Sequence, residues 1–93
     1  MSVKAIVLIK AQTDQVSRLA RSIAEVAGVS EVYSVAGQYD LVALVHARDN
    51  EGLAGIVSDG IRRLEGISYS ETLIAFRTLS KAQVATTHSV GLD

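Results

Sequence analysis

The stretch Val35-Ala36-Gly37-Gln38-Tyr39-Asp40-Leu41 lies near the middle of this 93-residue chain and separates two runs of apolar residues. Its four central residues supply a glycine, an amide, a phenol and a carboxylate in succession. Glycine permits backbone angles that other residues avoid, and the three side chains that follow it can form hydrogen bonds. The pattern predicts a turn between two strands that could also recognise a small ligand.

Each side of this turn is predicted to form one β-α-β unit. Before the turn, residues 3–10 are apolar on both alternating faces, which is typical of a central strand. A helix is expected between the capping residues 12–14 and Gly28, because apolar residues recur there at helical spacing. Residues 29–36 alternate without being apolar throughout, which favours an edge strand.

The second unit has the same order. Residues 41–47 predict another central strand, and residues 48–51 offer a cap for a helix that Gly66 closes. Gly60 lies on the apolar stripe of this helix, where the lack of a side chain is expected to let the helix approach the sheet. The last strand is expected at 67–77, so residues 1–78 would form one domain and 79–93 a partly ordered tail.

The two units are copies of one pattern. Residues 23–30 overlay residues 61–68 at a shift of 38, and the same shift places 7–10 on 45–48. Two such units joined by a hairpin predict an α+β fold, the ferredoxin-like β-α-β-β-α-β sandwich. It would have a four-stranded antiparallel sheet, with both helices on one face.

The other face of that sheet would be apolar and uncovered. We expect it to expose one alternating set of the central strands, namely Ile6, Leu8, Val42 and Leu44 or their alternates. Monomers rarely tolerate a large contiguous apolar patch. The sequence therefore predicts a homodimer packed sheet against sheet, with two-fold symmetry.

The amino-acid composition argues against several classes of function. Nine Lys and Arg residues balance ten Asp and Glu residues, and no basic run occurs, so direct nucleic-acid binding is not expected. The chain has no cysteine and two distant histidines, so we expect no metal site and no cofactor. The N-terminal apolar run is too short for a membrane span or a signal peptide, and a cytoplasmic protein is expected. No catalytic set can be drawn, so the chain is not expected to be an enzyme.

The candidate residues carry two interpretations each. Asp40 could bind a ligand ammonium or cap neighbouring backbone amides, or it could be an ordinary hairpin aspartate bonding its own turn. Gly37 could serve the turn or make room for a ligand, and Tyr39 could line a pocket or pack at a dimer seam. His46 is interpreted as a buried or interface histidine and not as a catalytic one, because no partner residue supports it.

The order of elements and the hairpin at 32–41 resemble the C-terminal effector-binding domain, or RAM domain, of the Lrp/AsnC family of regulators. That family has a Gly-x-Tyr/Phe-Asp motif in this hairpin, which reads Gly37-Gln38-Tyr39-Asp40 here. The strand Ser70-Glu71-Thr72-Leu73-Ile74 is similar to the family's closing strand, in which small hydroxyl residues precede an aliphatic pair. The resemblance covers residues 3 to 77.

The resemblance implies a non-enzymatic module that binds a small effector, such as an amino acid, in a cleft between protomers. The residues carried over are Gly37, Gln38, Tyr39 and Asp40, with Ser70 and Thr72 on the closing strand. It also implies homodimers that assemble into higher oligomers. No helix-turn-helix precedes residue 3, so we expect a stand-alone form that could pair with full-length Lrp/AsnC regulators.

Two alternatives share the predicted fold. A small dimeric enzyme similar to the cofactor-free monooxygenases is disfavoured, because the chain has no Trp and little aromatic content. An ACT-like regulatory module is disfavoured because residues 10–13, after the first strand, contain no glycine.

Overall fold

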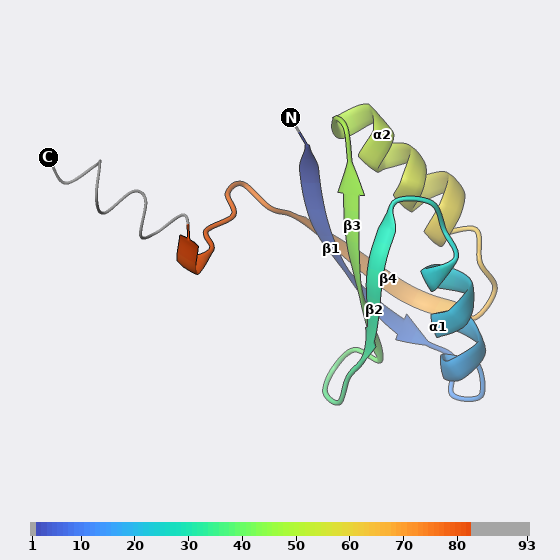
Figure 1. The fold of residues 1–93 in the computed structure, drawn as a ribbon. Coiled ribbons are helices and arrows are strands. Elements are labelled where there is room, and N and C mark those ends of the chain that lie inside the picture. Colours follow the sequence, from blue (N-terminus) through green and yellow to red (C-terminus); the bar gives the residue numbers. More distant parts are fainter. Residues whose placement is uncertain (1, 83–93) are drawn as a thin grey trace, which may run out of the picture.

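The computed structural model describes residues 2–82, and the part of the predicted tail from residue 83 onwards lies outside the described residues. The elements follow in the order β1 (Val3–Ala11), α1 (Val16–Ala24), β2 (Val29–Ser34), β3 (Leu41–Ala47), α2 (Asn50–Gly55), η1 (Ile56–Ile61) and β4 (Ile67–Ile74). They form one antiparallel sheet of order β2-β3-β1-β4, with the helices on one face (Figure 1). The predicted ferredoxin-like sandwich is confirmed, with β1 and β3 at its centre.

The core lies between the sheet and the helices. Alternate residues of β1 and β3 point into the core, and apolar residues of α1, α2 and η1 pack against them. The buried residues are Ala5, Val7, Ile9, Leu19, Ile23, Leu41, Ala43, Val45, Leu53, Val57 and Ile61. No polar or charged side chain between residues 2 and 82 is buried, so the core is held by apolar packing alone.

The internal repeat is visible in the backbone. Gly28 and Gly66 stand 38 residues apart, and their φ angles are +97° and +99°. Each precedes an outer strand, and each carbonyl accepts a 2.8 Å hydrogen bond at the end of a central strand. Gly28 accepts from the His46 N–H in β3, and Gly66 accepts from the Gln12 N–H just after β1. The same left-handed turn therefore returns the chain to the sheet in both units.

The first helix differs from the prediction at both ends. Residues 12–14 do not cap it: the N-cap is Gln15, which forms no side-chain capping bond, while Gln12 is held to Gly66. The helix ends at Ala24 and does not run on to Gly28, because the Val26 N–H bonds back to Ile23, only three residues earlier, and tightens the last turn.

The second helix begins as predicted, since Asp49 Oδ1 accepts a 2.7 Å hydrogen bond from the Gly52 N–H. It then widens from α2 into the π-helix η1, which the sequence pattern did not indicate. The prediction that Gly60 lets the helix approach the sheet is wrong. A Cβ added there would lie 2.7 Å from Val26 Cγ1, so the glycine lets η1 approach the turn after α1 and not the sheet.

Two strands are shorter than predicted. β2 ends at Ser34, and the Val35 N–H donates to the Asp40 carbonyl across the hairpin loop. β4 ends at Ile74, and the Ala75 N–H still donates to the Lys4 carbonyl of β1.

The uncovered face of the sheet carries the first of the two alternative residue sets that were predicted. The register pairs Ile6 with Leu44 and Leu8 with Val42, and their neighbours in the strands point into the core. Leu73 extends this row on β4 and Tyr33 extends the other on β2. We call this surface the open face; on the single chain Ile6, Tyr33 and Leu73 are 37%, 45% and 43% exposed.

Candidate functional site

Asp40 ties the central hairpin to the end of β1. Its carboxylate Oδ2 accepts a 2.8 Å hydrogen bond from the Ala11 N–H, and its own N–H donates to the Ile9 carbonyl at 2.8 Å. Ala11 lies 29 residues away in sequence, so this is not an aspartate bonding its own turn. Of the predicted roles, capping a neighbouring backbone amide is the one present, and it fixes the loop that carries the motif.

Position 37 needs a glycine because of its backbone conformation, and not because a side chain would lack space there. Its φ is +144°, in a region that side chains disfavour, and a Cβ added there would meet nothing within 4 Å. Gly37 and Gln38 are exposed at the tip of the hairpin loop. Both are therefore accessible to a molecule that approaches this end of the sheet.

Tyr39 contacts several polar and aromatic side chains beside the hairpin. We call this group the Tyr39 cluster; it consists of Lys10, Tyr39, Tyr69 and Glu71. The Tyr39 hydroxyl donates a 2.8 Å hydrogen bond to Glu71 Oε1. The Tyr39 and Tyr69 rings stack with centroids 6.4 Å apart, and Lys10 Nζ lies 5.7 Å and 5.9 Å from the two centroids. The ammonium is close enough for attraction to both rings.

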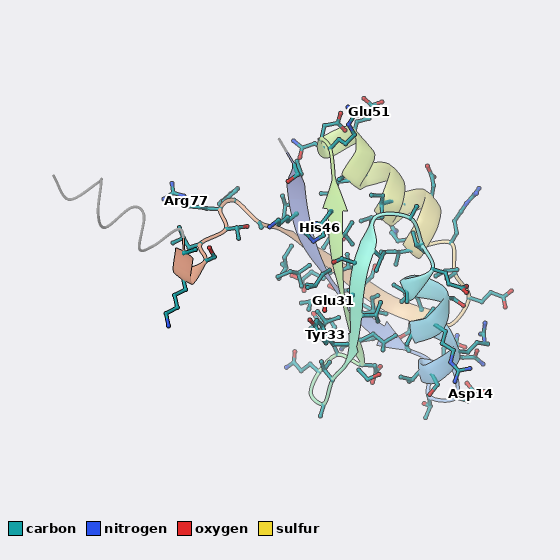
Figure 2. All side chains as sticks on the ribbon, in the orientation of Figure 1. Asp14, Glu31, Tyr33, His46, Glu51 and Arg77 are labelled. Atoms are coloured by element: carbon teal, nitrogen blue, oxygen red, sulfur yellow. The ribbon has the colours of Figure 1, made fainter. Side chains whose placement is uncertain are left out.

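The pKa of the Tyr39 phenol is raised above its ordinary value of 10.0. The largest cause is the hydrogen bond to Glu71, followed by loss of hydration and by repulsion from the Glu71 charge. A second pair on β2 repeats this chemistry: the Tyr33 hydroxyl donates to Glu31 Oε1 at 2.7 Å, which raises the pKa of Tyr33 mainly through that bond. Figure 2 shows Glu31 and Tyr33 side by side on the strand.

Ser70 and Thr72 lie on the opposite face of the sheet from Tyr39. They pair with Ile9 and Val7, whose side chains are in the core, so both hydroxyls point to the helix side. With Arg62 they line an open groove of about 570 Å³ along β4. The structure thus divides the six predicted ligand residues into a hairpin group and a groove group.

Tyr69 connects the two groups. Its ring stacks on Tyr39, and it also lines the groove with Ser70 and Thr72. Both groups are therefore at one corner of the sheet, where β1 ends and β3 and β4 begin. We call this place the hairpin corner.

The sequence interpretation missed Lys10, Tyr69, Glu71 and Arg62 at this corner. A signal for two of them was present, because alternation along residues 67–74 places Tyr69 and Glu71 on the face opposite Ser70 and Thr72. Contact with Tyr39 could not be predicted, because it depends on the register between β4 and β1.

His46 is exposed on β3 in the single chain, so the prediction of a buried histidine is wrong for the chain alone; a place in an interface stays a prediction. Between residues 2 and 82, no three His, Asp or Glu side chains gather in a group that could hold a metal ion. Within the same residues no helix is long and apolar enough to cross a membrane.

Comparison with known proteins identifies related chains. A family model described as the Lrp/AsnC ligand binding domain matches residues 4–85. An uncharacterised HTH-type transcriptional regulator of Pyrococcus abyssi is 34% identical over 64 residues. That alignment covers 69% of this chain and 43% of the regulator, so the chain spans less than half the length of that relative.

Solved structures agree with this match. TTHA0845 from Thermus thermophilus is 48% identical, with a TM-score of 0.80 over 85% of this chain and 99% of that one. The transcriptional regulator NMB0573 of Neisseria meningitidis, solved as its L-Met complex, has a TM-score of 0.75 at 14% identity. It covers 84% of this chain and is matched over 52% of its own, and at that identity the likeness concerns the fold alone.

Proposed function

The chain belongs to the family of Lrp/AsnC ligand-binding domains, and from that premise we propose that it is a non-enzymatic effector-binding module acting in transcriptional or metabolic regulation in the cytoplasm. The observation that carries this proposal is the anchored hairpin. Asp40 holds the Gly37–Asp40 loop against β1, and the loop presents Tyr39 next to Lys10 and Glu71. The hairpin corner offers hydrogen-bonding groups of both charges. Such groups can bind a small polar molecule without any chemical reaction.

The proposed effector is an amino acid. A molecule with a carboxylate and an ammonium would find the Lys10 ammonium and the Glu71 carboxylate on one side of the hairpin corner, and hydroxyls with Arg62 on the other. The L-Met complex of the Neisseria regulator makes methionine one compound to test first. We assign contact with the effector to Gly37, Gln38, Tyr39, Asp40, Ser70 and Thr72.

We further propose that the site is completed by a second copy. Within one chain the hairpin group and the groove group face opposite sides of the sheet at the hairpin corner, so a ligand lying between protomers would reach one group from each copy. The open face supplies the dimer contact through Ile6, Leu8, Val42 and Leu44, and dimers would assemble further at their hairpin corners. Full-length Lrp/AsnC regulators are the proposed protein partners.

The proposed mechanism is a population shift. An effector held between copies favours one assembly state by the difference between its affinities for the alternatives. Regulation then depends on which assemblies are populated, and the chain itself performs no chemistry.

Thermal unfolding with a panel of amino acids, including L-Met, tests the effector. A ligand present at 100 times its Kd stabilises the folded state by about 2.7 kcal/mol, which corresponds to a rise in Tm of roughly 10–20 °C for a domain of this size. Gln38→Ala and Tyr39→Phe should reduce that rise, while Ser58→Ala, on the exposed helix surface, should keep it.

Two results would contradict the proposal. If no amino acid raises the Tm, the effector class is wrong. If a rise occurs but survives in both hairpin variants, the effector binds somewhere other than the hairpin corner.

A further inference from the structure

The chain continues past β4 as the segment 75–82, which we call the arm; residues 75–80 form no helix or strand, and residues 81 and 82 are helical. At the start of the arm, the Ala75 N–H donates a 2.9 Å hydrogen bond to the Lys4 carbonyl of β1. Figure 1 shows that the arm leaves on the side of the sheet opposite the helices, which is the side of the open face. Arg77 lies on this side of the sheet in Figure 2, and it lines a hollow together with Ile6 and Leu44.

The arm exposes apolar side chains to an unusual degree. Phe76, the only phenylalanine of the chain, is 104% exposed, and Leu79 is 66% exposed. Single exposed apolar residues are ordinary on protein surfaces. Phe76 lines a small hollow with Ser2 and Lys4 at the start of β1. The arm thus carries two large apolar side chains that a partner could bury.

The arm also forms one wall of a hollow on the open face. This hollow, of about 500 Å³, has Ile6 and Leu44 on the sheet side and Leu79 on the arm side, with Lys4 and His46 also lining it. It lies at the end of the sheet away from the hairpin corner, since Lys4 pairs with His46 at the end of β3. The open face therefore extends from the strands onto the arm.

We infer that the arm is a clasp for a second copy of this chain, in which Phe76 and Leu79 of each protomer pack against the other. The inference rests on the sheet-face dimer proposed above. Packed sheets stand about 10 Å apart, so a second sheet on the open face occupies the space into which the arm projects. Two-fold symmetry then gives two arms, each reaching across to the other protomer.

Charge supports a second copy as the occupant. The arm carries Arg77 and Lys81 and no acidic residue between positions 75 and 82. The open face carries the carboxylates of Glu31 and Glu71, beside Leu44 and Leu8 respectively, although Lys4 and Lys10 lie toward its two ends. Where the cationic arm crosses the partner's Glu31 or the partner's Glu71, opposite charges meet.

A single tryptophan tests the clasp directly, because the chain has none of its own. In Phe76→Trp, fluorescence emission should move to shorter wavelength as rising protein concentration converts monomer to dimer, with the mass followed by sedimentation. Arg63→Trp, at an exposed position on the helix side, should show no such movement. Phe76→Ala should raise the dimer Kd by about 100-fold, since two aromatic side chains lose their burial, whereas Arg63→Ala should leave it unchanged.

Three results would overturn the clasp and are distinguishable. Emission that stays at long wavelength while the protein dimerises places the arm outside the interface and leaves the sheet-face dimer standing. Emission at short wavelength even in the monomer shows that the arm packs on its own chain. A mass that stays monomeric at every concentration removes the dimer itself, whether or not amino acids still raise the Tm.

Discussion

Removing the Asp40 carboxylate is the sharpest test of how the hairpin corner is built. In Asp40→Ala the Ala11 N–H loses the acceptor that it meets at 2.8 Å, and the hairpin loses its side-chain bond to β1. Hydrogen bonds to charged groups contribute about 1.5–3 kcal/mol. The low end applies here, because Asp40 is only half-buried and water can replace part of the bond.

A loss of about 1.5 kcal/mol corresponds to a fall in Tm of roughly 6–12 °C for a domain of this size. Calorimetry or circular dichroism of the full chain without ligand measures it. Asp40→Asn keeps an acceptor oxygen without the charge, so its Tm should lie between those of Asp40→Ala and the original protein. Asp14→Ala, at an exposed turn position, should change stability by less than about 0.5 kcal/mol.

A Tm for Asp40→Ala within about 2 °C of the original protein would show that the carboxylate does not anchor the loop. Contact with a ligand would then be the one role left for Asp40. The ligand-free measurement therefore separates the structural role from the proposed binding role.

Two further predictions concern close contacts. Gly60→Ala should destabilise the fold by about 1–3 kcal/mol, because its Cβ would lie 2.7 Å from Val26 Cγ1, whereas Gly55→Ala, with open space around it, should stabilise by about 0.4–1 kcal/mol. Chemical denaturation measures both, and Val26→Ala should weaken the penalty at Gly60; equal effects of the two alanines would contradict the contact. In Glu71→Gln the Tyr39 phenolate should form at lower pH by ultraviolet absorbance, because the bond to Glu71 raises the phenol pKa. The stability from that bond is fully present below about pH 10 and is lost as pH rises through the raised folded-state pKa, so an unchanged titration would contradict it.

The sequence was sufficient for the fold because its signals are local and repeated. Alternation along 3–10 and 41–47 identified the two strands that are covered by helices on one face, and the shift of 38 residues showed that one unit was used twice. The glycines at 28 and 66 mark the same turn in both units, and the structure gives them nearly the same φ. A pattern that recurs at two places constrains topology more than either copy alone.

The helix details could not be read from the same signals. Residues 12–14 have good capping chemistry, but Gln12 is drawn to Gly66, far along the chain, and the cap moves to Gln15. The widening at Ile56–Ile61 likewise includes Gly60, which lies close to Val26 of the other unit. Neighbours this far away in sequence are in no local window.

The candidate site was predictable as a loop but not as a set of contacts. The motif at 37–40 could be found from residue types and the resemblance, and Ser70 and Thr72 from the resemblance alone. The register of β4 on β1 is needed to place Glu71 next to Tyr39. The same register turns the side chains of Ser70 and Thr72 toward the helix side, away from Tyr39. A shift of one residue in the strand pairing moves every side chain of the strand to the other face. The sequence alone therefore does not predict which side chains meet.

The structure also relates the hairpin corner to the open face. Glu71 bonds Tyr39 at the corner, and it pairs with Leu8 in the apolar row that the proposed dimer buries. An effector that takes the Tyr39 hydroxyl away from Glu71 would leave that carboxylate without its hydrogen bond beside apolar surface, and such a group is costly where water is excluded. Effector binding and sheet-face assembly would then change each other's free energy by the same amount, as linkage requires. Glu71→Gln tests this link, because the neutral amide should weaken the effect of the ligand on the dimer Kd; an undiminished effect would exclude Glu71 as the connection.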